Sequence, residues 1–375
     1  MHISSNFDSG NIHVIEAASA DNIRLEIKPD HQSDFFQWFH FRLYTQALIP
    51  HQLTIENAHK AAFPEGWEDY QALASYDQEH WFRVPTTYDG EKLTIVFTPE
   101  HHSVYFAYFS PYSFERHQNL IQRAQLHPAC TIEHLGLTLD GRDLSLLKIG
   151  QENADKPVIW LTARQHPGES MAEWFIEGLI ERLLDEDDGV ARSLLNQATF
   201  YIVPNMNPDG SVRGHLRTNA NGINLNREWQ SPSLENSPEV FLVREKMLST
   251  GVSLFLDIHG DETIPYNFVA GCEGCPSYSE RQNFLERKFK KFLLSVTPEF
   301  QDAQGYPIDL PGEANLGLAT TWVGEHFGCL AFTLEMPFKD HNLLPDPLTG
   351  WSDERSRLFG KDFLTAIHHV VGDLY

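Results

Sequence analysis

The pattern of hydrophobic and polar positions changes character near residue 110. Before that point, every second residue is apolar over short segments such as residues 39–43 (FHFRL) and 93–97 (LTIVF). Residues 104–108 (VYFAY) are apolar or aromatic on both faces. A period of two, broken by segments rich in Pro, Gly and Asp, is typical of antiparallel strands packed in two layers. The first part of the chain is therefore predicted to be an antiparallel β-sandwich, with one short helix within residues 57–75.

After a predicted helical connector at residues 113–129, the pattern becomes one of alternating strands and helices. Strands buried on both faces are predicted where the chain is continuously apolar: residues 157–163, 198–204, 253–258 and 329–334. Helices are predicted between and after them, at residues 170–184, 238–250, 278–295 and 352–374. The first of these helices begins with a predicted capping box formed by Ser170 and Glu173.

Two domains follow from these patterns. We predict an N-terminal β-sandwich over residues 1–112 and an α/β domain over residues 113–375. Strand–helix alternation predicts a mixed, mostly parallel central sheet flanked by helices.

Composition narrows the class of protein. No stretch approaches the roughly 18 apolar residues of a membrane-spanning helix, and the first residues lack the basic start and apolar run of a secretory signal. Four cysteines among 375 residues are too few for a disulfide framework, so we expect a cytoplasmic protein. The net charge of −24 argues against nucleic acid or an anionic membrane surface as a partner.

The strongest chemical signal is the segment 164–169 (RQHPGE), which follows a predicted buried strand. Loops at the carboxyl ends of such strands are where open α/β sheets bind ligands. His166 and Glu169 lie three residues apart across a Pro-Gly turn and could converge on one metal ion. Alone, the pair could equally be two exposed polar residues.

A third metal ligand is suggested by His259, which ends the predicted strand at residues 253–258. Two histidines and one glutamate leave zinc an open fourth position for water, as in catalytic rather than structural sites. Zinc in such a site activates water and polarises a carbonyl group. The neighbouring Asp257 could hydrogen-bond a ligand, whereas Asp261 and Glu262 are expected to be solvated.

Further candidates follow other strands. Glu335 ends the last predicted buried strand, where a carboxylate is costly unless it has a function or a partner. Residues 207–210 (NPDG) predict a turn. Arg217, Asn226 and Arg227 lie beyond it and could hold a carboxylate and an oxyanion through charge-assisted hydrogen bonds.

In this order, these motifs resemble the carboxypeptidase A-type zinc metallocarboxypeptidase family, and most of all its cytosolic carboxypeptidase branch, whose eukaryotic members trim glutamates from tubulin tails. The resemblance rests on His166-x-x-Glu169 and His259-Gly260, and on residues 207–210, 224–229 (NLNREW) and 333–335 (TLE). Residues 38–41 (WFHF) and 106–112 (FAYFSPY) resemble motifs of the β-sandwich that precedes the catalytic domain in this branch.

The resemblance implies a carboxypeptidase-like fold and one zinc ion per chain, held by His166, Glu169 and His259. It further implies hydrolysis of the C-terminal peptide bond of peptides or protein tails by zinc-activated water. Glu335 would be the general base and acid, and Arg217 would stabilise the oxyanion, with Arg213 as the other arginine of that segment. Asn226 and Arg227 would bind the terminal carboxylate of the substrate.

The chain departs from the family at two places. The mobile tyrosine of the digestive members has no counterpart in residues 313–334, and Tyr306 is the nearest tyrosine. Residues 310–330 contain no Lys or Arg, which argues against a pocket for glutamate. The alternatives are a zinc amidase acting on cell-wall peptides or acylated amino acids, and a non-catalytic protein whose cleft is a relic. For the β-sandwich, two roles are open, namely narrowing the cleft or recognising protein tails.

Overall fold

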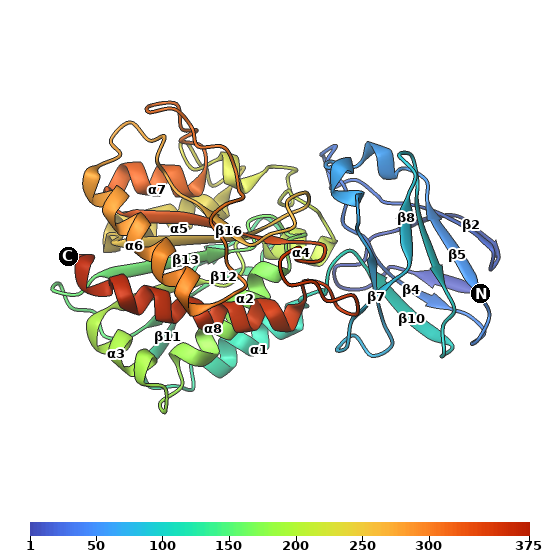
Figure 1. Ribbon diagram of the computed structural model, residues 1–375, viewed down its shortest axis with the longest axis horizontal. Helices are drawn as coiled ribbons and strands as arrows, with labels where there is room; N and C mark the ends of the chain where they lie inside the picture. Colours follow the sequence, from blue (N-terminus) through green and yellow to red (C-terminus); the bar gives the residue numbers. More distant parts are fainter.

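The computed structural model describes all 375 residues, which form an N-terminal β-domain beside a larger α/β domain (Figure 1). Two five-stranded sheets make up the β-domain. The first has the order β1 (His2–Ser4), β4 (His40–Tyr44), β10 (Ser103–Ala107), β6 (Ala72–Ser75) and β7 (Phe82–Val84). The second has the order β2 (His13–Ser19), β3 (Asn22–Glu26), β5 (His51–Ile55), β9 (Leu93–Phe97) and β8 (Thr86–Tyr88).

The β-domain is antiparallel, as the alternating pattern predicted, apart from the single parallel pair β3–β5. The helix expected within residues 57–75 is absent. Two short 3-10 turns, Ala58–Lys60 and Pro64–Trp67, occupy that segment and are followed by β6. Pro64 and Gly66 disfavour a longer helix, and burial of Trp67 and Tyr70 holds the segment against the core instead.

The α/β domain contains a seven-stranded mixed sheet whose four middle strands are parallel. In spatial order the strands are β11 (Cys130–Leu137), β12 (Asp143–Ile149), β14 (Thr199–Val203), β13 (Val158–Ala163), β15 (Leu254–Asp261), β17 (Leu330–Pro337) and β16 (Phe268–Ala270). The pairs β14–β13, β13–β15 and β15–β17 are parallel. The predicted mixed sheet with a mostly parallel centre is therefore confirmed.

Helices cover both faces of this sheet. On one face pack α1 (Phe114–Ala124), α2 (Met171–Leu183), α6 (Glu280–Val296) and α8 (Asp353–Val370), with α3 (Gly189–Gln197) beside α8. On the other face lie α5 (Pro238–Thr250) and α7 (Ala319–Phe327). Successive residues of the strands point to opposite faces of the sheet. Leu161 and Leu256 pack in the core under α2 and α8, and Trp160 and Phe255 pack in the core under α5 and α7. This two-sided burial explains why the parallel strands are continuously apolar.

Short elements complete the domain: α4 (Pro208–Arg213) and the 3-10 turns Leu225–Arg227 and Val371–Asp373. The predicted capping box of α2 is wrong. The Ser170 hydroxyl donates instead to the Ser110 carbonyl (2.8 Å), and the Glu173 carboxylate accepts from Arg164 and Asn205. Both side chains are buried, so tertiary partners replace the local cap. No helix is both long and apolar enough to cross a membrane.

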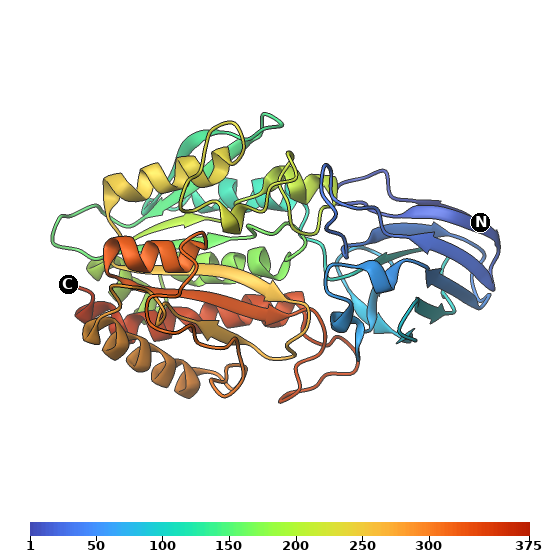
Figure 2. The same ribbon diagram turned by 90° about the horizontal axis from the view of Figure 1, so that it is seen from above.

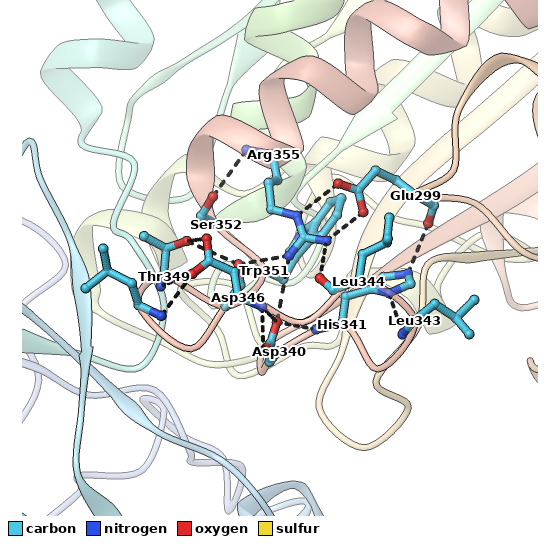
Figure 3. A network of polar contacts seen from close by, with 12 residues as sticks. Glu299, Asp340, His341, Leu343, Leu344, Asp346, Thr349, Trp351, Ser352 and Arg355 are labelled. Carbon is cyan, nitrogen blue, oxygen red and sulfur yellow. Dashed lines mark hydrogen bonds and ion pairs between the residues drawn. The ribbon is translucent and has the colours of Figure 1, made fainter.

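The loop between β17 and α8 contacts both domains. In the α/β domain, Arg355 of α8 donates to the Leu344 carbonyl of this loop (3.0 Å) and lies 3.7 Å from Asp340, while it pairs with Glu299 outside the loop (2.6 Å) (Figure 3). From the β-domain, Arg83 donates to the carbonyl oxygens of Phe338, Thr349 and Trp351. The chain just beyond Glu335 is therefore fixed between the two domains.

Candidate active site

The candidate site lies where the parallel strands end. In the β15–β17 register, His259 is the direct partner of Glu335, so these two side chains come from adjacent strand ends. The loop after β13 brings His166 and Glu169 to the same edge of the sheet. The arrows of β15 and β17 in Figure 2 point towards the N-terminal domain, so this edge faces the junction of the two domains.

Three buried side chains converge there. His166, Glu169 and His259 each offer a ligand atom, and these atoms lie within 4.8 Å of one another. The Glu169 carboxylate is 2.6 Å from His166 Nδ1 and 2.7 Å from His259 Nδ1, and the two Nδ1 atoms are 3.2 Å apart. The residues predicted to hold a metal ion are therefore brought together, with both histidines presenting the same ring nitrogen.

The outward-facing nitrogens of both histidines also have partners. His259 Nε2 is 2.7 Å from Asp257 Oδ2, the contact suggested by the sequence. His166 Nε2 is 3.1 Å from Asn224 Oδ1. Such contacts fix the ring orientation and the tautomer of metal-binding histidines. The role of Asn224 was missed, although its position within the NLNREW motif was a signal.

A buried arginine shapes the turn that carries His166. Arg164 has a φ of 58°, unusual for a residue other than glycine, and its guanidinium donates to the carbonyl oxygens of Pro167 and Tyr112 and to Glu173. Backbone conformations of this kind cost about 1–3 kcal/mol and persist where the surroundings enforce them. The turn between the two ligands is therefore held by its neighbours.

The buried groups of this cluster shift one another's pKa values. Burial alone raises the pKa of Glu169, but His166 and His259 outweigh it and bring that pKa well below its ordinary value. Burial lowers the pKa of His166 to about 4. Burial also lowers the pKa of His259, yet Asp257 and Glu169 hold it well above its ordinary value. The two histidines thus favour the ionised form of the buried Glu169 carboxylate, and Glu169 and Asp257 in turn favour the positively charged form of His259.

A cavity of about 490 Å³ opens beside the cluster. Its lining includes most of the remaining predicted residues: Arg217, Asn226, Arg227 and Glu335. The other arginine of that segment, Arg213, lies outside the lining and pairs with Asp140 (2.7 Å). The geometry thus gives Arg217, rather than Arg213, access to a molecule bound in the cavity.

Glu335 faces this cavity with one free oxygen. Its Oε2 is buried and has no hydrogen-bond partner, whereas Oε1 accepts from the Tyr306 hydroxyl (3.1 Å). Burial raises the pKa of Glu335 well above its ordinary value, opposed by His259 and reinforced by Glu169. Tyr306, whose part was left open by the sequence, thus reaches the candidate general base from a loop 29 residues upstream.

Two acidic residues expected to be solvated are buried instead. Asp261 accepts from the Tyr306 hydroxyl (2.6 Å) and from Thr263. Glu262 lies against the turn at Gly66 of the β-domain, and burial raises its pKa well above the ordinary value. The expectation failed because the sequence does not show that the β-domain covers this edge of the sheet.

The cavity lining also contains a lysine, which comes from outside residues 310–330. This residue, Lys290 of α6, lies 2.5 Å from Glu286 and 3.6 Å from Glu273. Asp302 and Asp309 also line the cavity. The charge of Lys290 is therefore already balanced, and Asp302 and Asp309 add negative charge to the lining.

Taken together, a buried three-ligand cluster at strand ends and a carboxylate facing the adjoining cavity define a metal-dependent hydrolase. Comparison with known proteins gives the same class. Residues 3–109 match the model of the cytosolic carboxypeptidase N-terminal domain, and residues 117–350 match that of zinc carboxypeptidase. The chain belongs to the zinc carboxypeptidase family and is a metallocarboxypeptidase.

Solved structures agree over the whole chain. A metallo-carboxypeptidase from Pseudomonas aeruginosa, in complex with (2-guanidinoethylmercapto)succinic acid, is 50% identical and has a TM-score of 0.97, with 100% of both chains covered. A metallo-carboxypeptidase from Burkholderia cenocepacia gives the same identity, coverage and TM-score. Mouse cytosolic carboxypeptidase 3 is 27% identical over 77% of this chain, which spans only 32% of that longer protein.

Proposed function

We propose that the protein is a zinc-dependent carboxypeptidase that removes residues from the carboxyl end of peptides or protein tails. The observation that carries this proposal is the convergence of His166, Glu169 and His259 beside a cavity that also exposes Glu335 and Arg227. One cavity thus offers a metal site, a proton acceptor and a cation for a free carboxylate. Those are the three requirements of hydrolysis at a chain terminus.

The residues present suit zinc. Two imidazole nitrogens and one carboxylate are its usual ligands in catalytic sites, and they leave a position open for water. Hydrogen bonds from the two rings to Asp257 Oδ2 and Asn224 Oδ1 already orient them. When bound, a zinc ion would polarise the scissile carbonyl group and make a water molecule more acidic.

The other residues have complementary roles in this mechanism. Glu335, with its free Oε2, takes the proton of the attacking water and passes it to the leaving amine. Arg217 stabilises the negative charge that develops on the carbonyl oxygen. Asn226 accepts from the Ala319 amide (2.8 Å), which leaves its side-chain amino group for the substrate's terminal carboxylate beside Arg227.

Lining charges favour a neutral or basic C-terminal residue over glutamate. Arg217 and Arg227 act on the carbonyl oxygen and the terminal carboxylate. The remaining lining cation, Lys290, is balanced by Glu286 and Glu273, which leaves no further positive charge for an acidic side chain. Asp302 and Asp309 add negative charge. The compound bound to the Pseudomonas aeruginosa relative is named as a guanidinoethyl derivative, and a basic group of this kind agrees with a preference for basic C-terminal residues.

The cytoplasm is the compartment we propose, because the curated relatives include proteins named cytosolic carboxypeptidases and all four cysteines are free.

Mass spectrometry of a mixed peptide library, incubated with the purified protein, tests the proposal. Stepwise loss of C-terminal residues is expected, fastest from peptides ending in Lys or Arg and slowest from those ending in Glu. A chelator and a Glu335→Gln variant should each abolish the loss, while the variant keeps its zinc. Peptides with an amidated carboxyl end serve as matched controls and should remain intact.

Other outcomes separate the alternatives. A zinc-containing protein that cleaves no peptide but hydrolyses acylated amino acids would favour the amidase reaction. A purified protein that neither contains nor binds zinc would contradict the mechanism. Equal rates on Glu-ending and Lys-ending peptides would refute the charge argument but leave the reaction intact.

A further inference from the structure

The loop that carries Arg217 makes several hydrogen bonds to the N-terminal domain. It follows α4 in the catalytic domain, yet several contacts come from the first 40 residues of the chain. Ser9 donates its backbone N–H to the Val212 carbonyl (3.0 Å), and the Asn11 side chain donates to the Gly214 carbonyl (3.0 Å). The His31 backbone N–H donates to His215 Nε2 (3.1 Å).

One buried carboxylate is the centre of these contacts. Asp30 Oδ1 accepts from the backbone N–H of Leu216 (2.7 Å). Its Oδ2 accepts from the N–H groups of Arg217 (2.8 Å) and Thr218 (2.9 Å) and from the Thr218 hydroxyl (3.0 Å). Asp30 is only 2% exposed. Charge-assisted hydrogen bonds of this kind are about twice as strong as neutral ones, so three consecutive residues around Arg217 are fixed by one side chain.

The Arg217 side chain itself also meets the N-terminal domain. Its guanidinium carbon is 5.7 Å from the ring centre of Phe35 and 5.2 Å from that of Phe63. Both rings lie within the distance at which a cation is attracted to an aromatic face. Asp30 therefore fixes where the side chain starts, and the two rings limit where it points.

The same loop is tied to the metal ligands. The Leu216 carbonyl accepts from the backbone N–H of Gly168, which lies between His166 and Glu169 (2.9 Å). Asp30 and Gly168 thus hold opposite sides of the Leu216 backbone. A shift of this loop would move Arg217 relative to the ligand turn.

We infer that Asp30 is a positioning residue for the reaction, and that the N-terminal domain completes the active site by holding Arg217 in place. The inference rests on the proposed function, in which Arg217 stabilises the developing oxyanion. It assigns the β-domain a role in catalysis that differs from narrowing the cleft or recognising protein tails. Asp30 acts through Arg217 and does not itself contact the substrate.

The sharpest variant is Asp30→Asn, which keeps the size of the side chain. Asparagine has one oxygen acceptor in place of two, so its amino group must face at least one of the backbone N–H donors. Removing a single oxyanion-hole donor elsewhere lowers kcat about 100- to 1,000-fold. A misplaced arginine should cost less, and we expect kcat to fall about 10- to 100-fold while KM and zinc content change little.

A double-mutant cycle with Arg217→Ala distinguishes positioning from general stability. Asp30→Asn should lower kcat in the wild-type background and have almost no further effect when Arg217 is absent. Asp8→Asn is the matched control, because Asp8 also accepts a backbone N–H across the domain boundary, from Phe114 (2.7 Å), but does not touch the Arg217 loop. Its kcat should remain within about twofold of wild type.

A second measurement does not depend on activity. Hydrogen exchange of the amides of Leu216, Arg217 and Thr218 should be faster in Asp30→Asn, with the rest of the fold unchanged. Unchanged exchange at these amides would overturn the inference, even if the protein proved to have no peptidase activity.

The remaining outcomes are equally decisive. An equal loss of kcat in both backgrounds would overturn the inference, because Asp30 would then act independently of Arg217. A loss in Arg217→Ala with none in Asp30→Asn would overturn it while leaving the proposed function intact. Full activity in Arg217→Ala would refute both the oxyanion role of Arg217 and the positioning role of Asp30.

Discussion

Replacing Arg83 with methionine should loosen the junction between the two domains. Arg83 lies in β7 of the N-terminal domain, and its guanidinium donates four hydrogen bonds to backbone carbonyl oxygens. One acceptor is Gln71 of the same domain (2.6 Å). The other three belong to the loop after β17: Phe338 (2.8 Å), Thr349 (3.1 Å) and Trp351 (3.2 Å). Methionine keeps the apolar stem and removes every donor.

The structure sets the size of the effect. Hydrogen bonds to a charged group contribute about 1.5–3 kcal/mol each, and a buried acceptor left without a partner costs about 1–3 kcal/mol. Water will reach some of the freed carbonyl oxygens, because Arg83 is only partly buried. Four bonds are lost, three of them across the junction, and with this partial compensation by water we expect the free energy of unfolding to fall by about 3–5 kcal/mol. The backbone N–H of Arg83, which donates to the Leu348 carbonyl (2.7 Å), is retained.

Urea unfolding followed by tryptophan fluorescence measures this loss, with peptidase assays below the transition. Lys92→Met is the control, because Lys92 is a surface residue paired with Glu56 and should contribute less than about 1 kcal/mol. The variant should also show a lower kcat, since the loop begins three residues after Glu335. A loss below about 1 kcal/mol with unchanged kcat would refute the idea that Arg83 couples the domains.

Three further predictions concern single side chains. Burial raises the pKa of Glu239 to about 8. Because this exceeds the pKa in the unfolded chain, the contribution of Glu239 to stability is complete below about pH 4.5 and is lost as the pH rises through 8. Relative to wild type, Glu239→Gln should therefore gain up to about 3 kcal/mol of stability between pH 4.5 and 7, and a difference in urea midpoint between variant and wild type that is the same at both pH values would contradict this. Asp257→Asn should weaken zinc binding about 10- to 100-fold by releasing His259, as measured by competition with a chelator. Tyr306→Phe should lower kcat several-fold without changing zinc affinity, because Glu335 loses its hydroxyl donor; an unchanged pH profile and kcat would exclude this role.

Elements with a strong local signal were predicted well from the sequence. The strand Val158–Ala163 was recognised because both of its faces are buried, which leaves a continuous apolar run. The helix Pro238–Thr250 has the predicted bounds, since proline begins it and Gly251 follows it. In contrast, the hairpin Cys130–Leu137 and Asp143–Ile149 was not predicted, because its first strand is mostly half-exposed at the edge of the sheet. The helix Ala319–Phe327 was missed as well, being short and interrupted by glycine.

The candidate site divides in the same way. Short sequence motifs were enough to recognise His166, Glu169 and His259 as candidates, and the structure brings these three residues together. Tyr306 and Lys290 carry no such motif. Their relation to the cavity depends on how a loop and α6 pack against β16 and β17, which is a property of the tertiary structure. Residue identity could show which groups have useful chemistry, but not which distant segments approach them.

The contacts that orient the proposed metal ligands come from one domain, and those that orient the proposed oxyanion-stabilising arginine come from the other. The rings of the proposed metal ligands are oriented by Asp257 and Asn224, both from the catalytic domain. Arg217, which is proposed to stabilise the oxyanion, is oriented by Asp30 and by two aromatic rings of the N-terminal domain. Metal binding and turnover should therefore respond differently to changes at the domain junction. A protein with a weakened junction should still bind zinc but lose kcat, because the carbonyl oxygen would meet the metal site without a correctly placed guanidinium.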